Sequence, residues 1–155
     1  MESGAWIAHL ADWPGAVWLQ QSGTAYLFVN ATHILGIALL LGGILPLDWQ
    51  LLRGRASATL AMLVRSAGGG LTLALLTGCW LFTVQPASYL VNAAFQFKMG
   101  LLALALVNVL VQHRCAGLRQ ALATGVVTGT VRLRAALSLL LWLAVLVAGR
   151  WIGFV

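Results

Sequence analysis

The sequence predicts an all-α integral membrane protein, a four-helix bundle with an N-terminal interfacial helix. Of its 155 residues, 61% are hydrophobic and 8% are charged, whereas about a quarter of the residues in a typical soluble domain are charged. Four apolar segments each approach the roughly 20 residues that a helix needs to cross a bilayer. They occupy most of the chain, so residues 1–155 are predicted to form a single transmembrane domain.

The interfacial helix is expected over residues 3–21. This segment mixes tryptophans with His9, Asp12 and Gln20, and Pro14 interrupts it. Indole rings favour the headgroup region of a membrane, so the segment is expected to lie on the bilayer rather than across it. Acidic residues near the start are unlike the positive first part of a secretory signal.

The four spans are predicted at residues 25–47, 66–84, 93–112 and 131–153. Pro46 and Asp48 mark the end of the first span, and Pro86 closes the second. A short helix beginning at Ser57 and carrying Arg65 is expected just before the second span. The second and third spans are joined by a short connection, so they are expected to be antiparallel neighbours.

Arginines accumulate in two of the three connections between spans. They are Arg53, Arg55, Arg114, Arg119, Arg132 and Arg134. Basic connections favour the cytoplasmic side, which predicts a bacterial inner-membrane protein with both termini in the periplasm. Because these residues lie at the ends of spans and form no basic stripe, a nucleic-acid partner is not expected. At the same boundary, Asp48 is expected to form an ion pair with Arg53 or Arg65.

His33 is the first candidate functional residue, about eight residues or 12 Å into the first span. Ionisable side chains at this depth are costly and often functional. Asn30, Gly36 and Gly43 share its helical face, which would suit either a planar ligand or close helix packing. The imidazole is expected to ligate haem iron or a metal, to hydrogen-bond a neighbouring helix, or to transfer a proton.

Lys98 is the second candidate, about five residues into the third span from the same side. Small and polar residues share its face: Ala94, Leu101, Ala105, Asn108 and Gln112. The lysine would either extend to the outer headgroups, or pair with an anionic group such as a haem propionate, or ligate iron as a neutral amine. Since the first and third spans run parallel, Lys98 and His33 can belong to one site.

Three further ionisable residues are weighed for this site. Arg150 would suit a propionate or a quinone oxygen, although its place near the end of the fourth span favours contact with headgroups. His9 could fold over the outer mouth of the bundle as a second axial ligand. His113, beside Arg114, is expected to be interfacial.

Three stretches of the chain resemble an uncharacterised family of small bacterial four-helix membrane proteins. The first, residues 26–54, contains Asn30, His33, Gly36, Gly43 and Asp48, followed by Leu51, Leu52 and Gly54. The others contain Asn92, Phe95, Lys98 and Asn108 in the third span and Ser138, Trp142, Gly149 and Arg150 in the fourth. The resemblance covers nearly the whole chain and implies the four-helix fold, but it brings no established activity.

The histidine in an early helix and the lysine that opens a later one are also distantly similar to two groups of membrane proteins. These are the membrane domains of copper-resistance D proteins and the J-type protoporphyrinogen oxidases. The latter resemblance implies haem b at His33 and Lys98 only. The flanking sequences differ and no second histidine matches, so porphyrinogen oxidation is not implied.

Three functions follow as hypotheses. The leading one is a b-type haem protein that transfers electrons between quinone and a periplasmic partner. The alternative is a copper-handling permease or accessory protein that uses His33, Cys79 and Met99, which supply the softer ligand atoms that copper prefers. The third is a non-catalytic subunit that packs against other membrane proteins. Patterns for hydrolytic chemistry are absent from the sequence.

Overall fold

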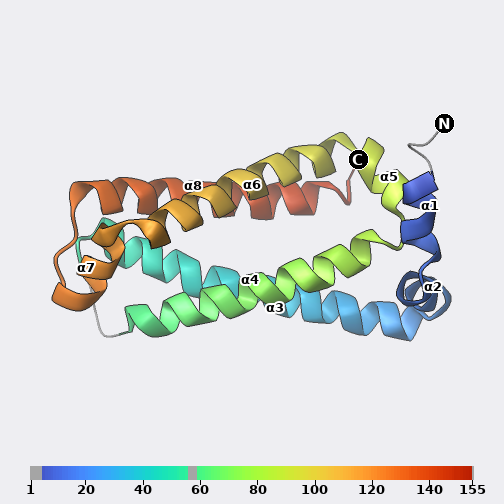
Figure 1. Ribbon diagram of the computed structural model, residues 1–155, viewed down its shortest axis with the longest axis horizontal. Coiled ribbons are helices and arrows are strands. Elements are labelled where there is room, and N and C mark those ends of the chain that lie inside the picture. The colour runs from blue at the N-terminus through green and yellow to red at the C-terminus, as the bar shows by residue number, and fades with distance from the viewer. Residues whose placement is uncertain (1–4, 56–58, 155) are drawn as a thin grey trace.

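Four long helices form the protein, as the computed structural model shows for residues 5–55 and 59–154 (Figure 1). They are α3 (Gly23–Leu52), α4 (Leu60–Phe82), α6 (Ala93–Arg114) and α8 (Gly129–Trp151). Each is long and apolar enough to cross a membrane. Large apolar side chains such as Phe28, Leu104 and Leu140 are exposed on their outer faces, as expected for helices in contact with lipid. The predicted all-α membrane bundle is confirmed.

Four short helices lie at the two ends of this bundle. They are α1 (Ala5–Asp12), α2 (Pro14–Gln21) and α5 (Pro86–Val91) at one end and α7 (Ala116–Thr124) at the other (Figure 1). From residue 5 onward the helix predicted over residues 3–21 is two helices, because Trp13 is extended and Pro14 begins a new helix where its missing N–H costs nothing; residues 3 and 4 lie outside the described part of the chain. The sequence did not predict α5 and α7.

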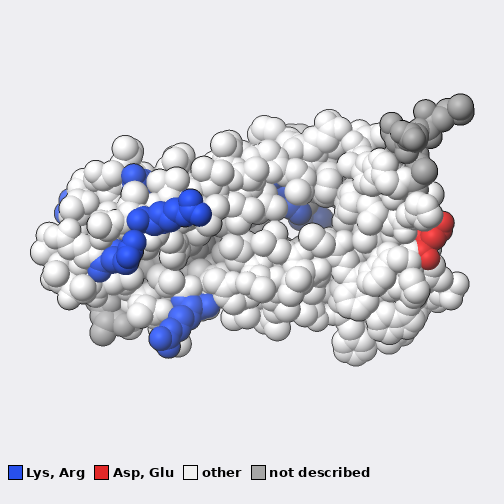
Figure 2. All heavy atoms as spheres, in the orientation of Figure 1, with Lys and Arg blue, Asp and Glu red and all other residues white. Residues whose placement is uncertain are grey.

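Charged and aromatic side chains distinguish the two ends. The α7 end carries the arginines of the two basic connections and is called the basic end (Figure 2). The opposite end exposes Trp6, Trp13, Trp18 and Trp151 and is called the aromatic end. Figure 2 also shows basic atoms in a recess nearer the aromatic end. Tryptophans and arginines at opposite ends of a bundle are typical anchors at membrane interfaces.

The N-terminal helices are fastened to the end of α4. The indole Nε1 of Trp80 donates a 3.0 Å hydrogen bond to the Gly15 carbonyl. The Gln20 side chain donates to the carbonyl of Val84 at 3.2 Å and to that of Ala11 at 3.0 Å. These bonds fix α1 and α2 over the aromatic end, where the start of α3 and the end of α8 also lie (Figure 1).

The long helices pack as two pairs, α3 with α4 and α6 with α8, and α3 also packs on α8. The expectation that the second and third spans are neighbours is wrong, since α4 and α6 do not pack along their length in the described residues. The two helices approach at the aromatic end, where Phe82 and Phe95 stack at 5.6 Å and Tyr89 of α5 contacts both rings. The glycine face of α4 pairs it with α3 instead.

Two predicted helix ends also need correction. Helix α3 continues through Pro46 to Leu52: proline removes one backbone bond, but the turn that follows buries Leu47 and Leu51, so packing holds it helical. Helix α4 begins at Leu60, so Arg65 lies within it and not in a separate helix. The predicted start of that helix at Ser57 lies outside the described residues.

The contact between α3 and α4 depends on three glycines. A methyl group built at Gly36 would lie 2.7 Å from the Ala74 backbone nitrogen, and one at Gly43 would lie 2.6 Å from that of Ala67. One at Gly70 would lie 2.7 Å from the Gly36 carbonyl oxygen. The two backbones therefore touch, which is the usual way that small residues hold membrane helices together.

Replacing Gly43 by alanine should weaken this contact. The new methyl group would meet the α4 backbone, so we expect Gly43→Ala to lower the free energy of unfolding by about 1–3 kcal/mol. The matched control is Gly42→Ala, because a methyl group there meets no atom within 4 Å and alanine favours a helix by about 1 kcal/mol over glycine. The measurement is SDS-induced unfolding of the detergent-solubilised protein, and equal stabilities of the two variants would contradict the prediction.

Candidate functional site

His33 lies on the face of α3 that meets α4. Its Nδ1 is 3.0 Å from the hydroxyl of Thr77, and that hydroxyl lies 2.6 Å from the Leu73 carbonyl, to which it donates its hydrogen. The hydroxyl therefore accepts from His33, which assigns the ring proton to Nδ1. In this tautomer the ring lone pair is on Nε2.

A glycine of α4 makes space for this imidazole. A methyl group at Gly78 would lie 3.0 Å from Cε1 of His33 and 3.9 Å from its Nε2. Because Gly78 directly follows Thr77, one turn of α4 supplies both the hydrogen-bond acceptor and the room for the ring. The orientation of His33 is thus set by Thr77 and Gly78 together with a hydrogen bond to the Ala74 backbone.

Lys98 is half-buried on α6 and rests on a glycine of α8. A methyl group at Gly149 would lie 3.5 Å from its Cε and 3.8 Å from its Nζ. Within residues 5–55 and 59–154, no hydrogen bond or ion pair is found for its ammonium group. Its charge acts electrostatically on the His33 imidazole, and that the two residues form one site stays a prediction.

Two other predicted residues lie close to His33 in sequence but differ in their surroundings. Asn30 is half-buried, about one turn nearer the aromatic end. Gly36 is buried against the α4 backbone, where not even a methyl group fits. Gly36 therefore serves helix packing, and the small-residue face has no space there for a planar ligand.

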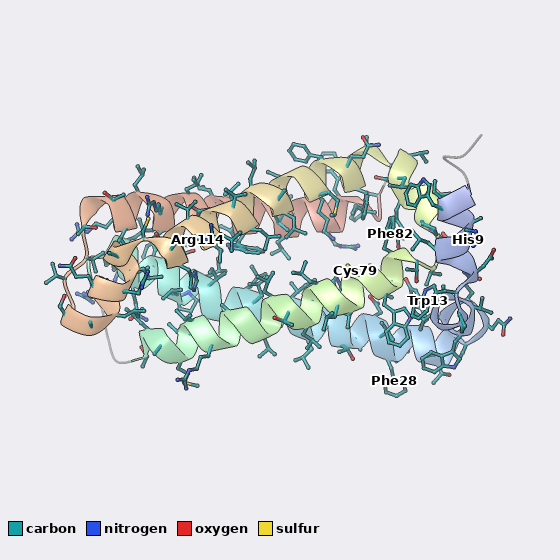
Figure 3. The ribbon with its side chains drawn as sticks, in the orientation of Figure 1. His9, Trp13, Phe28, Cys79, Phe82 and Arg114 are labelled. Atoms are coloured by element: carbon teal, nitrogen blue, oxygen red, sulfur yellow. The ribbon has the colours of Figure 1, made fainter. Side chains whose placement is uncertain are left out.

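Arg150 and His9 both lie on the outside of the protein. The guanidinium of Arg150 is exposed and sits 4.7 Å above the ring of Phe154. His9 is exposed on α1 at the aromatic end (Figure 3). No contact joins either side chain to His33 or Lys98 in the part of the chain that the structure describes.

The proposed copper ligands do not form a recognisable centre. Cys79 is a free, exposed thiol on α4, and the Met99 side chain is exposed on α6. No group of three His, Cys, Asp or Glu side chains that could hold a metal occurs in the described ranges. Copper handling stays a prediction that these positions neither support nor contradict.

A second polar cluster lies near the basic end, and sequence reasoning missed it. Asp48 of α3 is only 2% exposed, and Ser138 of α8 is its side-chain hydrogen-bond partner. The expected ion pair with Arg53 or Arg65 is wrong, because no salt bridge to Asp48 occurs in the described residues and Arg53 instead stacks 4.5 Å from the Trp49 ring.

The missed cluster had a signal in the sequence. Asn108 and Gln112 already shared the small and polar face of the third span, and both are buried, as is Ser138 of α8. Ending the first span at residue 47 placed Asp48 at the membrane boundary and hid its relation to them. Continuing that helix by one turn would have brought the carboxylate onto the same inner surface.

A cleft of about 480 Å³ opens at the aromatic end, between α2, α3 and the turn after α4. It is lined by Leu19, Gln20, Gly23, Tyr26, Val84 and Gln85. Tyr26 precedes His33 by seven residues, which is two helical turns on one face of α3. The cleft does not include His33 or Lys98, but it opens at the end of the bundle nearest to them.

These features define an all-α membrane bundle with an oriented histidine and a half-buried lysine near one end. Comparison with known proteins adds no relative: no protein-family model, curated protein or solved structure matches the chain. The site must therefore be interpreted from its own geometry.

The role of Thr77 can be tested directly. Thr77→Val removes the acceptor for Nδ1–H with little change of volume, so we expect the His33 ring to lose its preference for the Nδ1-protonated tautomer. The measurement is the ¹⁵N NMR spectrum of histidine-labelled protein. Thr72→Val is the matched control, because the Thr72 hydroxyl bonds only within its own helix, to the Gly68 carbonyl at 3.0 Å. An unchanged His33 signal in Thr77→Val would contradict the assignment.

Proposed function

We propose that this chain is a b-type haem membrane protein in which Nε2 of His33 is the axial ligand. The observation that carries the proposal is the hydrogen bond from Nδ1–H of His33 to Thr77. Metal-ligating histidines almost always donate their other ring N–H to an oxygen, which fixes the tautomer and the ring direction. His33 has this arrangement, inside a long apolar helix.

Lys98 supports the same proposal by its charge. An ammonium group half-buried in a membrane bundle, with no anion beside it in the described residues, suits an anionic ligand group. In the proposed site Lys98 pairs with a haem propionate or provides the second iron ligand. Asn30 is close enough in sequence to contribute a polar contact, whereas Gly36, Arg150 and His9 have no part in this version of the site.

The chemistry proposed is electron transfer. A bound haem supplies one-electron redox chemistry, while the chain holds and orients it through His33 and balances its charge through Lys98. The cleft beside Tyr26 lies about 10 Å along α3 from His33, so a quinone or a partner protein that docks at the aromatic end would come within range of the haem.

The haem proposal predicts a spectrum that depends on two named residues. Protein purified in detergent after expression with added haem precursor should show a Soret band and a pyridine-haemochrome signal. His33→Ala should reduce the haem content at least about tenfold, in line with losses at metal ligands and their partners, and Lys98→Ala should shift the spectrum or lower occupancy. His113→Ala is the matched control, because His113 is exposed and bonds the carbonyl of its own helix at Val109.

Two outcomes would contradict the haem proposal. One is wild-type protein that elutes as a folded species and carries no haem. The other is stoichiometric copper that is lost in His33→Ala while haem is absent, which would establish the copper alternative instead.

The proposed cellular setting is the bacterial inner membrane, with the basic end in the cytoplasm and both termini in the periplasm. The arginines of the basic end support this orientation. We expect a cysteine placed at Gln85 to react with a membrane-impermeant thiol reagent added to intact spheroplasts, and one placed at Arg55 to react only after lysis. Both residues are exposed, and the background variant carries Cys79→Ala and Cys115→Ala. The reverse pattern would invert the topology.

A further inference from the structure

A small cavity lies within the second polar cluster, between three of the long helices. Its volume is about 20 Å³, and its walls come from α3, α6, α7 and α8. The polar residues on these walls are Asp48, Asn108, Gln112, His113 and Ser138. A cavity of this size holds one particle as large as a water molecule.

Two oxygen atoms at this cavity have no hydrogen-bond donor. They are Oδ2 of Asp48 and Oε1 of Gln112, and both are buried without a partner in the described residues. The amide nitrogen of Asn108 donates to the Arg134 carbonyl at 3.2 Å, which leaves its amide oxygen as an acceptor. The buried atoms that lack a partner at this cavity are therefore oxygen acceptors.

The charge of the carboxylate is also unbalanced. Asp48 is 2% exposed and forms no ion pair with a described residue. The other titratable residue on the cavity wall is His113, whose side chain is exposed and whose Nδ1 lies 2.9 Å from the Val109 carbonyl. A buried, unpaired carboxylate is strongly unfavourable in a bundle of this kind.

Four occupants can be compared by space and charge. A proton on Asp48 would remove the charge but needs no cavity. One water would fill the cavity and donate to both oxygens, but it would leave the carboxylate unpaired. A divalent cation would replace one negative charge by one positive charge. A small monovalent cation satisfies the volume, the acceptors and the charge together.

We propose that this cavity binds a single dehydrated Na⁺ ion between Asp48, Asn108, Gln112 and Ser138. Oxygen ligands of carboxylate, amide and hydroxyl type are those that hard cations prefer. The ion would join α3, α6 and α8 near the basic end, where His113 and Leu118 also line the cavity. This site is separate from His33 and Lys98 and does not rest on haem binding.

Thermal unfolding of the purified full-length protein tests the proposal. At equal ionic strength, NaCl should raise the Tm above its value in choline chloride in a saturable manner, by about 5 °C when Na⁺ is near 100 times its Kd. KCl should raise it less, because K⁺ is larger. Asp48→Asn should abolish the Na⁺ response, whereas the matched control Asp12→Asn, at an exposed carboxylate of α1, should retain it.

A second variant and a direct binding measurement test the proposal even if Asp48→Asn does not fold. Gln112→Met keeps the volume and removes one ligand, so we expect equilibrium binding of radioactive Na⁺ to weaken at least about tenfold. Equal Tm values of the wild-type protein in NaCl and choline chloride would overturn the proposal. The proposal would also be overturned if the Tm depended on pH because of titration of Asp48 and did not depend on Na⁺. In that case a proton on Asp48 would take the place of the ion.

Discussion

The contact between the backbones of α3 and α4 is the constraint on which the rest of the structure depends. Gly36, Gly43 and Gly70 let the two helices touch, and this contact sets the rotation of α3 about its own axis. With that rotation fixed, the imidazole of His33 meets Thr77 on one side of the pair, and Asp48, four turns further along, enters the bundle near α8. Both polar sites are thus consequences of one apolar contact.

Much of the fold could be predicted from the sequence because a membrane leaves few alternatives. Low charge and four long apolar segments predict four spans, and the polar face of α6 follows from helical periodicity. Pairing could not be predicted in the same way. A short connection suggested that α4 and α6 are neighbours, yet the glycine face of α4 determines its partner. Helical periodicity identifies a face of small residues, but it does not identify the helix that will pack against that face.

The candidate site, too, could be predicted from the sequence only in part. The depth of His33 and the parallel course of two spans were enough to associate it with Lys98, since both follow from counting residues along helices. The hydrogen bond to Thr77 required knowledge of which face of α4 lies opposite, and the burial of Asp48 required knowing that α3 passes through Pro46 without ending. Local sequence rules treat proline as a stop, whereas here tertiary packing keeps the helix intact beyond it.

The arrangement in pairs has a mechanical consequence. The α3–α4 pair and the α6–α8 pair are joined through α3 and α8, while in the described residues α4 and α6 approach each other through aromatic rings at one end. A bundle joined along one seam can turn about that seam without disturbing either pair. The buried carboxylate of Asp48 and its partner Ser138 lie on the seam, so their surroundings would change little in such a rotation.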